Sequence, residues 1–522
     1  MGIMKLRTFF ITYVTYATFH VARKSFGAIK GELGKEQWMV SSLASQSNMY
    51  GLMDMVFMGF YAVGLYVSGM LGDRINLRLF LSSGMVMDAL LLITFGAAGL
   101  ADIHNYWFYL ALWGINGAVQ SCGWPSSIAI MSKWFGHNER GVVMGMWSSC
   151  ASIGNIWGGA LVGLLYSYTE PTLAWKLVMI TAGGLMLLQS LVVFCFLVPS
   201  PPRHLHLHSD HDDHDDVTAI KKKERKMQND DLPLDDASSP PLEGISFWKA
   251  CAIPGVLSYS IAYACVKSVT YSLFFWVPYY LTAARHMTNS NANLYSVMYD
   301  VGAILGGISG GFITDRMGVR SPYVVFSMCI AGIMLHFLFA ASEHMTGVLL
   351  FLTGLLMGGP EMLITTSIAA DLGSNPALTG NSEALATVTG IIDGTGSVGC
   401  AVMQYLVGRV ANCHTSCSDE GVCTTACAWD SVFFLLQLSV IVGVVSLSRV
   451  AVIELQEWWR GSPASSADHP VPHRPVLQDE EMAGDWLGGP GPDTPGTVRT
   501  PAPALPVPGM SSDDEQELTH RT

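Results

Sequence analysis

The chain has 522 residues, of which 50% are hydrophobic and 13% are charged, and its formal net charge is −13. Soluble globular proteins carry about 25% charged residues, so this composition excludes a soluble enzyme, a nucleic-acid-binding protein and a secreted disulfide scaffold. Residues 199–246 and 456–522 together contribute −12 of the net charge, so the apolar remainder is nearly neutral.

Apolar runs as long as a membrane span recur along the chain. A helical span needs about 20 mostly apolar residues, and long runs without strict alternation favour helices over barrel strands. No small-residue cleavage site follows the first run, so we expect a retained span and not a signal peptide. The sequence predicts an all-α membrane protein with twelve spans, at about residues 7–29, 53–72, 79–100, 106–131, 141–166, 174–198, 250–282, 292–314, 322–342, 346–369, 384–409 and 429–453.

The polar segments divide these spans into two sets of six. Residues 1–198 and 247–455 are expected to form two six-helix halves. Segment 199–246 is too polar to bury a core, and segment 456–522 holds 11 of the 24 prolines, so both are expected to be disordered, as a linker and a tail.

Basic residues in the short loops predict the orientation. Loops on the side of the linker hold more lysine and arginine than those on the opposite side, where Lys30, Lys35, Lys176 and Arg285 are expected. By the positive-inside rule, the linker and both termini are predicted to be cytoplasmic.

One loop motif occurs twice. GMLGDRINLR follows the second span and GFITDRMGVR follows the eighth, and both read G-x-x-x-D-R-x-x-x-R. Copies at equivalent places indicate a duplication, and the motif resembles that of the major facilitator superfamily, whose halves are repeats around a midplane site. We expect its residues to brace helix ends at the cytoplasmic face: Gly69, Asp73, Arg74, Arg78, Gly311, Asp315, Arg316 and Arg320.

The first span carries the sharpest candidate site. Tyr13, Tyr16, His20 and Arg23 follow a 3-4-3 spacing and share one helix face. That polar face predicts a watery cavity, in which a guanidinium would bind a phosphate or carboxylate. Lys24 points about 100° away and would add a second positive charge. The alternative is that Arg23 only extends to the membrane surface.

The first span of the second half carries Lys267, so a cation from each half would face a shared cavity. Either Lys267 contacts the anion directly, or it pairs with an intramembrane acid. Gln120 and Trp124 could also face the cavity, and Pro125 would kink their helix. The candidate acids could balance charge, carry a proton or hold helices together: Asp88, Asp300, Glu361 and Asp393.

Four cysteines cluster between the last two spans, on the side opposite to the linker. Two disulfides among Cys413, Cys417, Cys423 and Cys427 are the favoured interpretation, with three possible pairings. A small zinc site is the alternative. Disulfides would indicate an oxidising compartment, such as the endoplasmic reticulum, another secretory membrane or the cell surface. No cofactor, metal or nucleic acid is predicted to bind, and the protein is expected to be a monomer.

Several longer stretches resemble the organophosphate:phosphate antiporters of this superfamily, which include the solute carrier family 37 sugar-phosphate exchangers and plant glycerol-3-phosphate transporter-like proteins. They include YVTYATFHVARKSF, NGAVQSCGWPS and IIDGTGSVG. By this resemblance, Arg23 is the phosphate-binding arginine, Lys24 the lysine after it, and Tyr16 and His20 cavity residues. Thr270 stands where bacterial members have a second arginine.

The resemblance implies exchange of a phosphorylated sugar or glycerol-3-phosphate for inorganic phosphate by alternating access. Exchange would follow if the empty, strongly cationic site reoriented slowly. One alternative is a proton-coupled symporter of another organic anion, with Glu361 or Asp393 as the proton site. Another is a non-transporting membrane receptor or scaffold. Because no nucleotide-binding loop or catalytic constellation is found, an enzyme is not expected.

Overall fold

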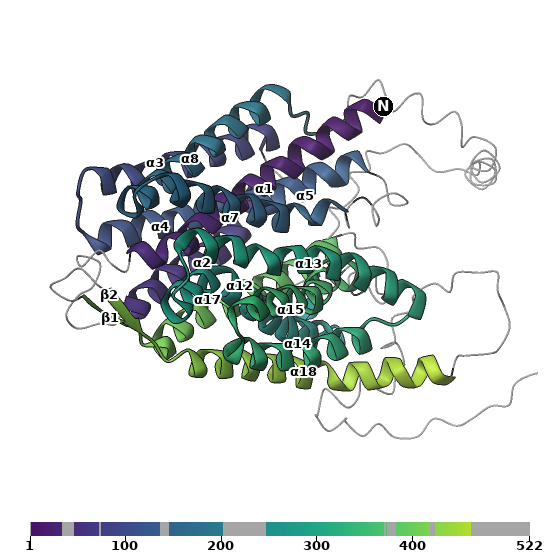
Figure 1. Cartoon of the computed structure of the whole chain (residues 1–522). Coiled ribbons are helices and arrows are strands. Elements are labelled where there is room, and N and C mark those ends of the chain that lie inside the picture. The colour runs from purple at the N-terminus through teal and green to yellow at the C-terminus, as the bar shows by residue number, and fades with distance from the viewer. Residues whose placement is uncertain are drawn as a thin grey trace, which may run out of the picture. The chain divides into compact units, whose positions relative to one another are not determined.

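The computed structural model describes a protein that is almost entirely helical (Figure 1). The described residues are 2–33, 46–72, 75–135, 143, 146–201, 247–369, 372, 383–417 and 423–460. Most of the predicted linker and tail, at 202–246 and 461–522, lies outside them.

The first half contains six long helical segments before the linker. The fourth is broken at Ser121 and Cys122, and Pro125 lies in the first turn after the break, where a proline is tolerated. The predicted kink is therefore an interruption between two helices. The elements are α1 (Gly2–Leu33), α2 (Gln46–Gly72), α3 (Leu77–Leu100), α4 (Tyr106–Gln120) with α5 (Gly123–Trp134), α7 (Cys150–Tyr168) and α8 (Pro171–Phe196).

The second half repeats this arrangement after a short extra helix. Gly255, with φ of 91°, separates that helix from the next, so the predicted span 250–282 begins later than expected. The elements are α11 (Phe247–Cys251), α12 (Val256–Arg285), α13 (Asn289–Met317), α14 (Ser321–Ala340), α15 (Glu343–Leu363) continued by the π-helical η2 (Ile364–Ile368), α17 (Glu383–Ala411) and α18 (Trp429–Arg460).

Two short strands stand between α17 and α18, and the sequence did not predict them. Strands β1 (His414–Cys417) and β2 (Cys423–Ala426) pair in antiparallel register. Within the described part of the chain, nine helices are long and apolar enough to cross a membrane. With the remaining long helices, the chain shows the expected arrangement of six helices on each side of the linker.

Helices α13 and α15 approach so closely that glycine is required between them. A Cβ at Gly302 would overlap the carbonyl oxygen of Phe351, and a Cβ at Gly354 would overlap that of Tyr299. Small residues permit such backbone contact between membrane helices. This packing holds the middle of α13, which carries Asp300, against α15, which carries Glu361.

Gly302→Ala is therefore expected to destabilise the folded protein by roughly 1–3 kcal/mol, the usual range for overpacking. The melting temperature of the purified protein in detergent would fall. Gly184→Ala is the matched control, because nothing lies within 4 Å of a Cβ there. A Gly302→Ala protein that melted with wild type would contradict this packing.

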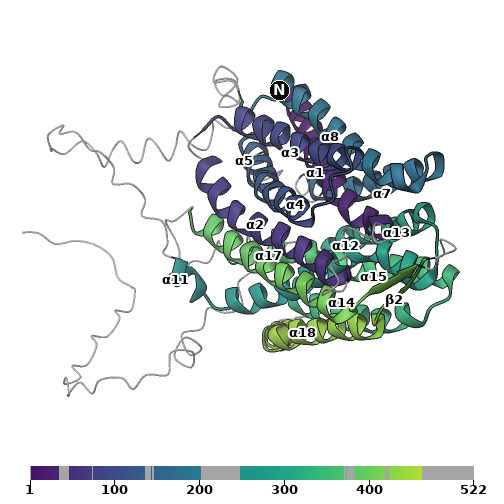
Figure 2. The ribbon, with the colours of Figure 1, turned by 90° about the vertical axis from the view of Figure 1, so that its left-hand side faces the viewer.

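The halves meet along α2 with α17 and α7 with α13, which run side by side (Figures 1 and 2). Hydrogen bonds join the halves at the end of the bundle where α1 ends. Tyr279 Oη donates to Gln46 Oε1 at 3.2 Å, and Asn289 Nδ2 donates to Glu32 Oε2 at 3.0 Å. These contacts link the halves at the end of the bundle that carries the hairpin, where Gln46 N also donates to the Cys413 oxygen at 3.1 Å.

Candidate functional site

A cavity of about 150 Å³ lies between the two halves. Sites for drug-sized ligands hold roughly 300–1,000 Å³, so this cavity suits a small ligand. Its walls come from α1, α2, α5 and α7 of the first half and from α12, α13, α15 and α17 of the second. Seven of the predicted site residues line it: Tyr16, His20, Trp124, Lys267, Asp300, Glu361 and Asp393.

Arg23 lies behind this lining and not in it. The side chain is completely buried, and its Cζ lies 4.7 Å from the centroid of the Tyr61 ring. Nη1 donates to Tyr271 Oη at 3.0 Å, and Nε donates to Gln120 Oε1 at 3.2 Å. Tyr61 and Tyr271 both line the cavity, so two tyrosines, one from each half, cover the guanidinium. The sequence predicted an open polar face, because it could not show these rings.

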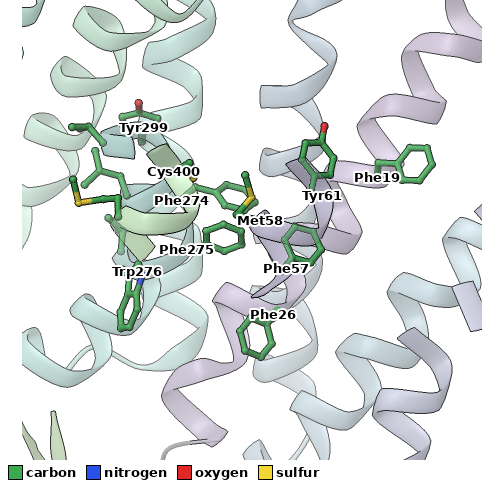
Figure 3. Packing of buried hydrophobic residues seen from close by; sticks show 14 of the residues in the cluster. Phe19, Phe26, Phe57, Met58, Tyr61, Phe274, Phe275, Trp276, Tyr299 and Cys400 are labelled. Carbon is green, nitrogen blue, oxygen red and sulfur yellow. The ribbon is translucent and has the colours of Figure 1, made fainter. Parts of the chain in front are cut away.

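The aromatic wall around Arg23 extends along the interface between the halves. Phe57 and Tyr61 of α2 face Phe274 and Phe275 of α12 (Figure 3). Phe57 and Phe275 contact edge to face, with ring centroids 6.3 Å apart. Rings at these positions stabilise a cation through their electron-rich faces and exclude water from it.

Arg23 retains an unused donor. Among the described residues, its buried Nη2 has no hydrogen-bond partner. A buried donor without a partner costs about 1–3 kcal/mol, and more when it is charged. An anion that reached Arg23 would therefore find this donor without a hydrogen bond.

Gln120 connects Arg23 to a buried acid. Its amide nitrogen donates to Asn116 Oδ1 at 2.9 Å and to Asp88 Oδ1 at 3.4 Å, and Asn116 Nδ2 also donates to Asp88. Gln120 thus orients the guanidinium from behind. Gln120 thereby connects Arg23 to the carboxyl group of Asp88 on α3, which makes no direct contact with Arg23 in these hydrogen bonds.

Lys267 is paired with an acid, the second of the two alternatives that the sequence left open. Its Nζ donates to Asp393 Oδ1 and to Ser397 Oγ, both at 2.8 Å. The lining also contains Asp300 and Glu361. The expectation of a strongly cationic empty cavity is therefore wrong, because the described lining holds three acidic residues and one lysine, and that lysine is paired with Asp393.

A chain of hydrogen bonds crosses the cavity from one half to the other. Asn155 Nδ2 donates to Asp300 Oδ1 at 2.7 Å, and the Asn155 oxygen lies 2.9 Å from His20 Nδ1. Since an amide oxygen only accepts, Nδ1 of His20 carries the proton. Lys24 lies outside the lining: it is buried and donates to the backbone oxygen of Phe274 at 3.4 Å.

The position of Lys30 differs from the one expected from the sequence. It was expected in a loop, but it lies in α1, fully buried, and forms an ion pair with Asp54 of α2. Its Nζ also donates to the Phe275 oxygen of α12 at 3.2 Å and lies 4.2 Å from the Trp276 ring centroid. Asp54 was missed, although an acid in an apolar run is a recognisable signal.

The structure describes more contacts for the second copy of the loop motif than for the first. Asp315 Oδ1 lies 4.0 Å from Arg320 Nη2, and Arg316 lies over the Phe312 ring at 4.1 Å. The first contact links the end of α13 to the start of α14, the second lies within α13, and the bracing role stays a prediction. In the first copy, Arg78 follows Asn76, whose side chain caps α3, whereas Asp73 and Arg74 and any contacts at Gly69 lie outside the description.

Cys413 and Cys427 form a disulfide across the base of the hairpin. The backbones of Cys417 and Cys423 pair opposite each other, and their side chains lie outside the description. The hairpin also contacts the first half, because Cys413 N donates to Ser47 Oγ at 2.7 Å.

Comparisons with known proteins identify related sequences and folds. A family model described as the Major Facilitator Superfamily matches residues 9–404. The chain is 36% identical over 472 residues to sugar phosphate exchanger 3 of Homo sapiens, which covers 86% of this chain and 92% of the relative. An Arabidopsis thaliana relative named for glycerol-3-phosphate transport is 33% identical over 481 residues, 88% of this chain and 93% of that protein.

A solved structure supports the fold. The crystal structure of a bacterial homologue of the human lysosomal transporter Spinster, inward-facing and unoccupied, matches with a TM-score of 0.60 and 16% identity. The match covers 89% of this chain and 99% of that one. At this identity the likeness shows a shared fold, and the expected all-α arrangement of two six-helix halves is confirmed.

Proposed function

The chain belongs to the major facilitator superfamily, within the family of the sugar phosphate exchangers, and we propose that it carries phosphorylated substrates. It exchanges a phosphorylated sugar or glycerol-3-phosphate for inorganic phosphate by alternating access. The observation that carries this proposal is Arg23, a buried guanidinium between the halves with an unused donor.

The phosphoryl group would bind between Arg23 and Lys267. Tyr271 stands between the two cations: its oxygen accepts from Arg23, and its ring centroid lies 5.7 Å from Lys267 Nζ. Phosphate oxygens would replace the tyrosine oxygen on Arg23 and make bidentate hydrogen bonds, which a guanidinium favours. Binding would thus move Tyr271 and draw α1 and α12, one helix from each half, onto the same ligand.

The organic part of the substrate would lie against the aromatic side of the cavity. Tyr16 and Trp124 form a pair there, with ring centroids 5.0 Å apart. His20 and Asn155 offer hydrogen-bonding groups for hydroxyls. A small polyol or sugar fits this combination of apolar faces and polar edges.

A second candidate function follows from the acids in the lining. Asp300, Glu361 and Asp393 line the cavity together with Lys267, so protons could accompany an anion through this cavity. Proton-coupled symport would then be driven by a pH gradient without internal phosphate. The buried cations favour either kind of transport over a receptor or scaffold, and over an enzyme.

Uptake by proteoliposomes tests the substrate class. Vesicles loaded with inorganic phosphate would be offered labelled glucose-6-phosphate, glycerol-3-phosphate and their unphosphorylated parents. We expect uptake of one or more of the esters and of neither parent. Uptake that a pH gradient drives equally well into phosphate-free vesicles would favour symport, and uptake of the parents would contradict the proposed substrate class.

We further propose that both termini are cytoplasmic and that the hairpin faces an oxidising compartment. The Cys413–Cys427 disulfide supports the compartment, because such bonds persist in secretory membranes and at the cell surface. A monomer suffices for this proposal, since both halves of the cavity come from one chain.

A further inference from the structure

The ion pair between Lys267 and Asp393 lies inside the proposed site. Lys267 belongs to α12 and Asp393 to α17, and their side chains are 5% and 19% exposed. Both line the cavity. Ser397, one turn further along α17, accepts a second hydrogen bond from Lys267 and donates its own to the Asp393 backbone oxygen at 3.0 Å.

Helices α12 and α17 have other contacts that hold them together. Trp276 Nε1 donates to Gln404 Oε1 at 3.0 Å, and the Gln404 amide donates to Ser272 Oγ at 3.3 Å. Gly396 lies against the Tyr263 ring and Gly399 against Ala264. The charged pair is thus not the only link between these helices, and it is placed where the substrate is expected.

An anion that reaches Lys267 meets a carboxylate already there. Two anions on one ammonium repel each other strongly where water is scarce. The phosphoryl group must therefore displace the Asp393 carboxylate, at least in part, before it can bind the lysine closely.

We propose that Asp393 is an internal anion that occupies Lys267 in the empty transporter and yields it to the phosphoryl group of the substrate. This inference rests on the proposed function. Asp393 acts on the substrate through Lys267, so it is a positioning residue and not a ligand of the phosphate.

Two consequences follow. Competition from Asp393 weakens phosphate binding, so the affinity is lower than the two cations alone would give. Asp393 also balances Lys267 when no substrate is bound, which makes reorientation of the empty carrier easier. Exchange is then accompanied by a slow uncoupled phosphate flux, and Asp393 sets its rate.

The test is phosphate transport by Asp393→Asn in proteoliposomes. We expect its KM for inorganic phosphate to fall at least about tenfold, equivalent to about 1.4 kcal/mol. The ratio of efflux with external phosphate to efflux without it should rise by at least a similar factor, because the empty carrier now holds an unbalanced lysine. Asp393→Ser also lacks the charge and should show the same changes in KM and in the efflux ratio. It replaces Asp393→Asn in the test if that variant folds poorly.

Asp430→Asn is the matched control. It makes the same aspartate-to-asparagine change at an exposed position in the first turn of α18, outside the cavity lining, so its KM should stay close to that of wild type. KM does not depend on the amount of folded protein, so a purely structural role for Asp393 would lower the maximal rate and leave KM unchanged.

The outcomes separate this inference from the proposed function. If the wild-type protein exchanges phosphate but the neutral Asp393 variants have an unchanged or higher KM, the proposed role of Asp393 is wrong. The proposed function is not affected by that result. A wild-type protein that exchanges no phosphate would overturn the proposed function and this inference with it.

Discussion

Arg23→Lys is expected to lower kcat/KM for phosphate exchange at least about thirtyfold. Truncating one member of a buried, hydrogen-bonded charge pair costs about 2–5 kcal/mol, and each 1.4 kcal/mol is a factor of about ten. Lysine keeps the positive charge but cannot make bidentate hydrogen bonds to a phosphoryl group. It also cannot contact Gln120 and Tyr271 at the same time from one planar group, as Arg23 does.

The initial rate of labelled-phosphate uptake over a range of concentrations measures this effect. Arg7→Lys is the control, since Arg7 lies exposed on the same helix and should leave transport unchanged. Wild-type kcat/KM in the Arg23→Lys protein would show that this guanidinium does not bind the phosphoryl group.

Lys30→Met is expected to destabilise the folded protein by roughly 3–5 kcal/mol, because it leaves the fully buried Asp54 without its counter-ion. The same change removes the hydrogen bond that joins α1 to the Phe275 oxygen of α12. The melting temperature in detergent should fall clearly, and the fraction of monodisperse protein should fall with it.

The double variant Lys30→Met with Asp54→Leu tests whether the unpaired Asp54 carboxylate causes the loss of stability. Replacing a buried ion pair by apolar residues of similar volume is often neutral or stabilising, so the double variant should recover most of the lost stability. A double variant less stable than Lys30→Met would contradict an explanation based on the unpaired carboxylate.

The sequence predicted the helices well where the apolar runs were long and bounded by charge. The predicted helix boundaries were wrong where the local backbone conformation sets the start or end of a helix. The break between α4 and α5 precedes Pro125, and Gly255 starts α12 in the left-handed region. The hairpin between α17 and α18 is too short to give a periodic signal.

The charged residues of the site could be predicted from the sequence, but the residues that they contact could not. Arg23 and Lys267 stood out because charged residues are rare in apolar spans. Their partners did not, because Tyr271 lies 248 residues from Arg23 and Asp393 lies 126 residues from Lys267. The packing of the two halves brings Tyr271 to Arg23, whereas the packing of α12 against α17 within the second half brings Asp393 to Lys267.

The burial of Lys30 could not be predicted for a similar reason. The first apolar run was expected to end at residue 29, which placed this lysine in a loop. In the structure α1 continues to Leu33, and a buried acid on α2 allows the charge to remain inside. A charged residue at the end of a run cannot be placed without its partner.

Phosphate counterflow measures whether this protein exchanges phosphate through Arg23. Purified wild-type protein would be reconstituted into vesicles with or without internal inorganic phosphate, and labelled phosphate would be added outside. We expect rapid uptake that depends strongly on internal phosphate and is lost in Arg23→Ala. Equal uptake with and without internal phosphate, or full uptake by Arg23→Ala, would contradict this expectation.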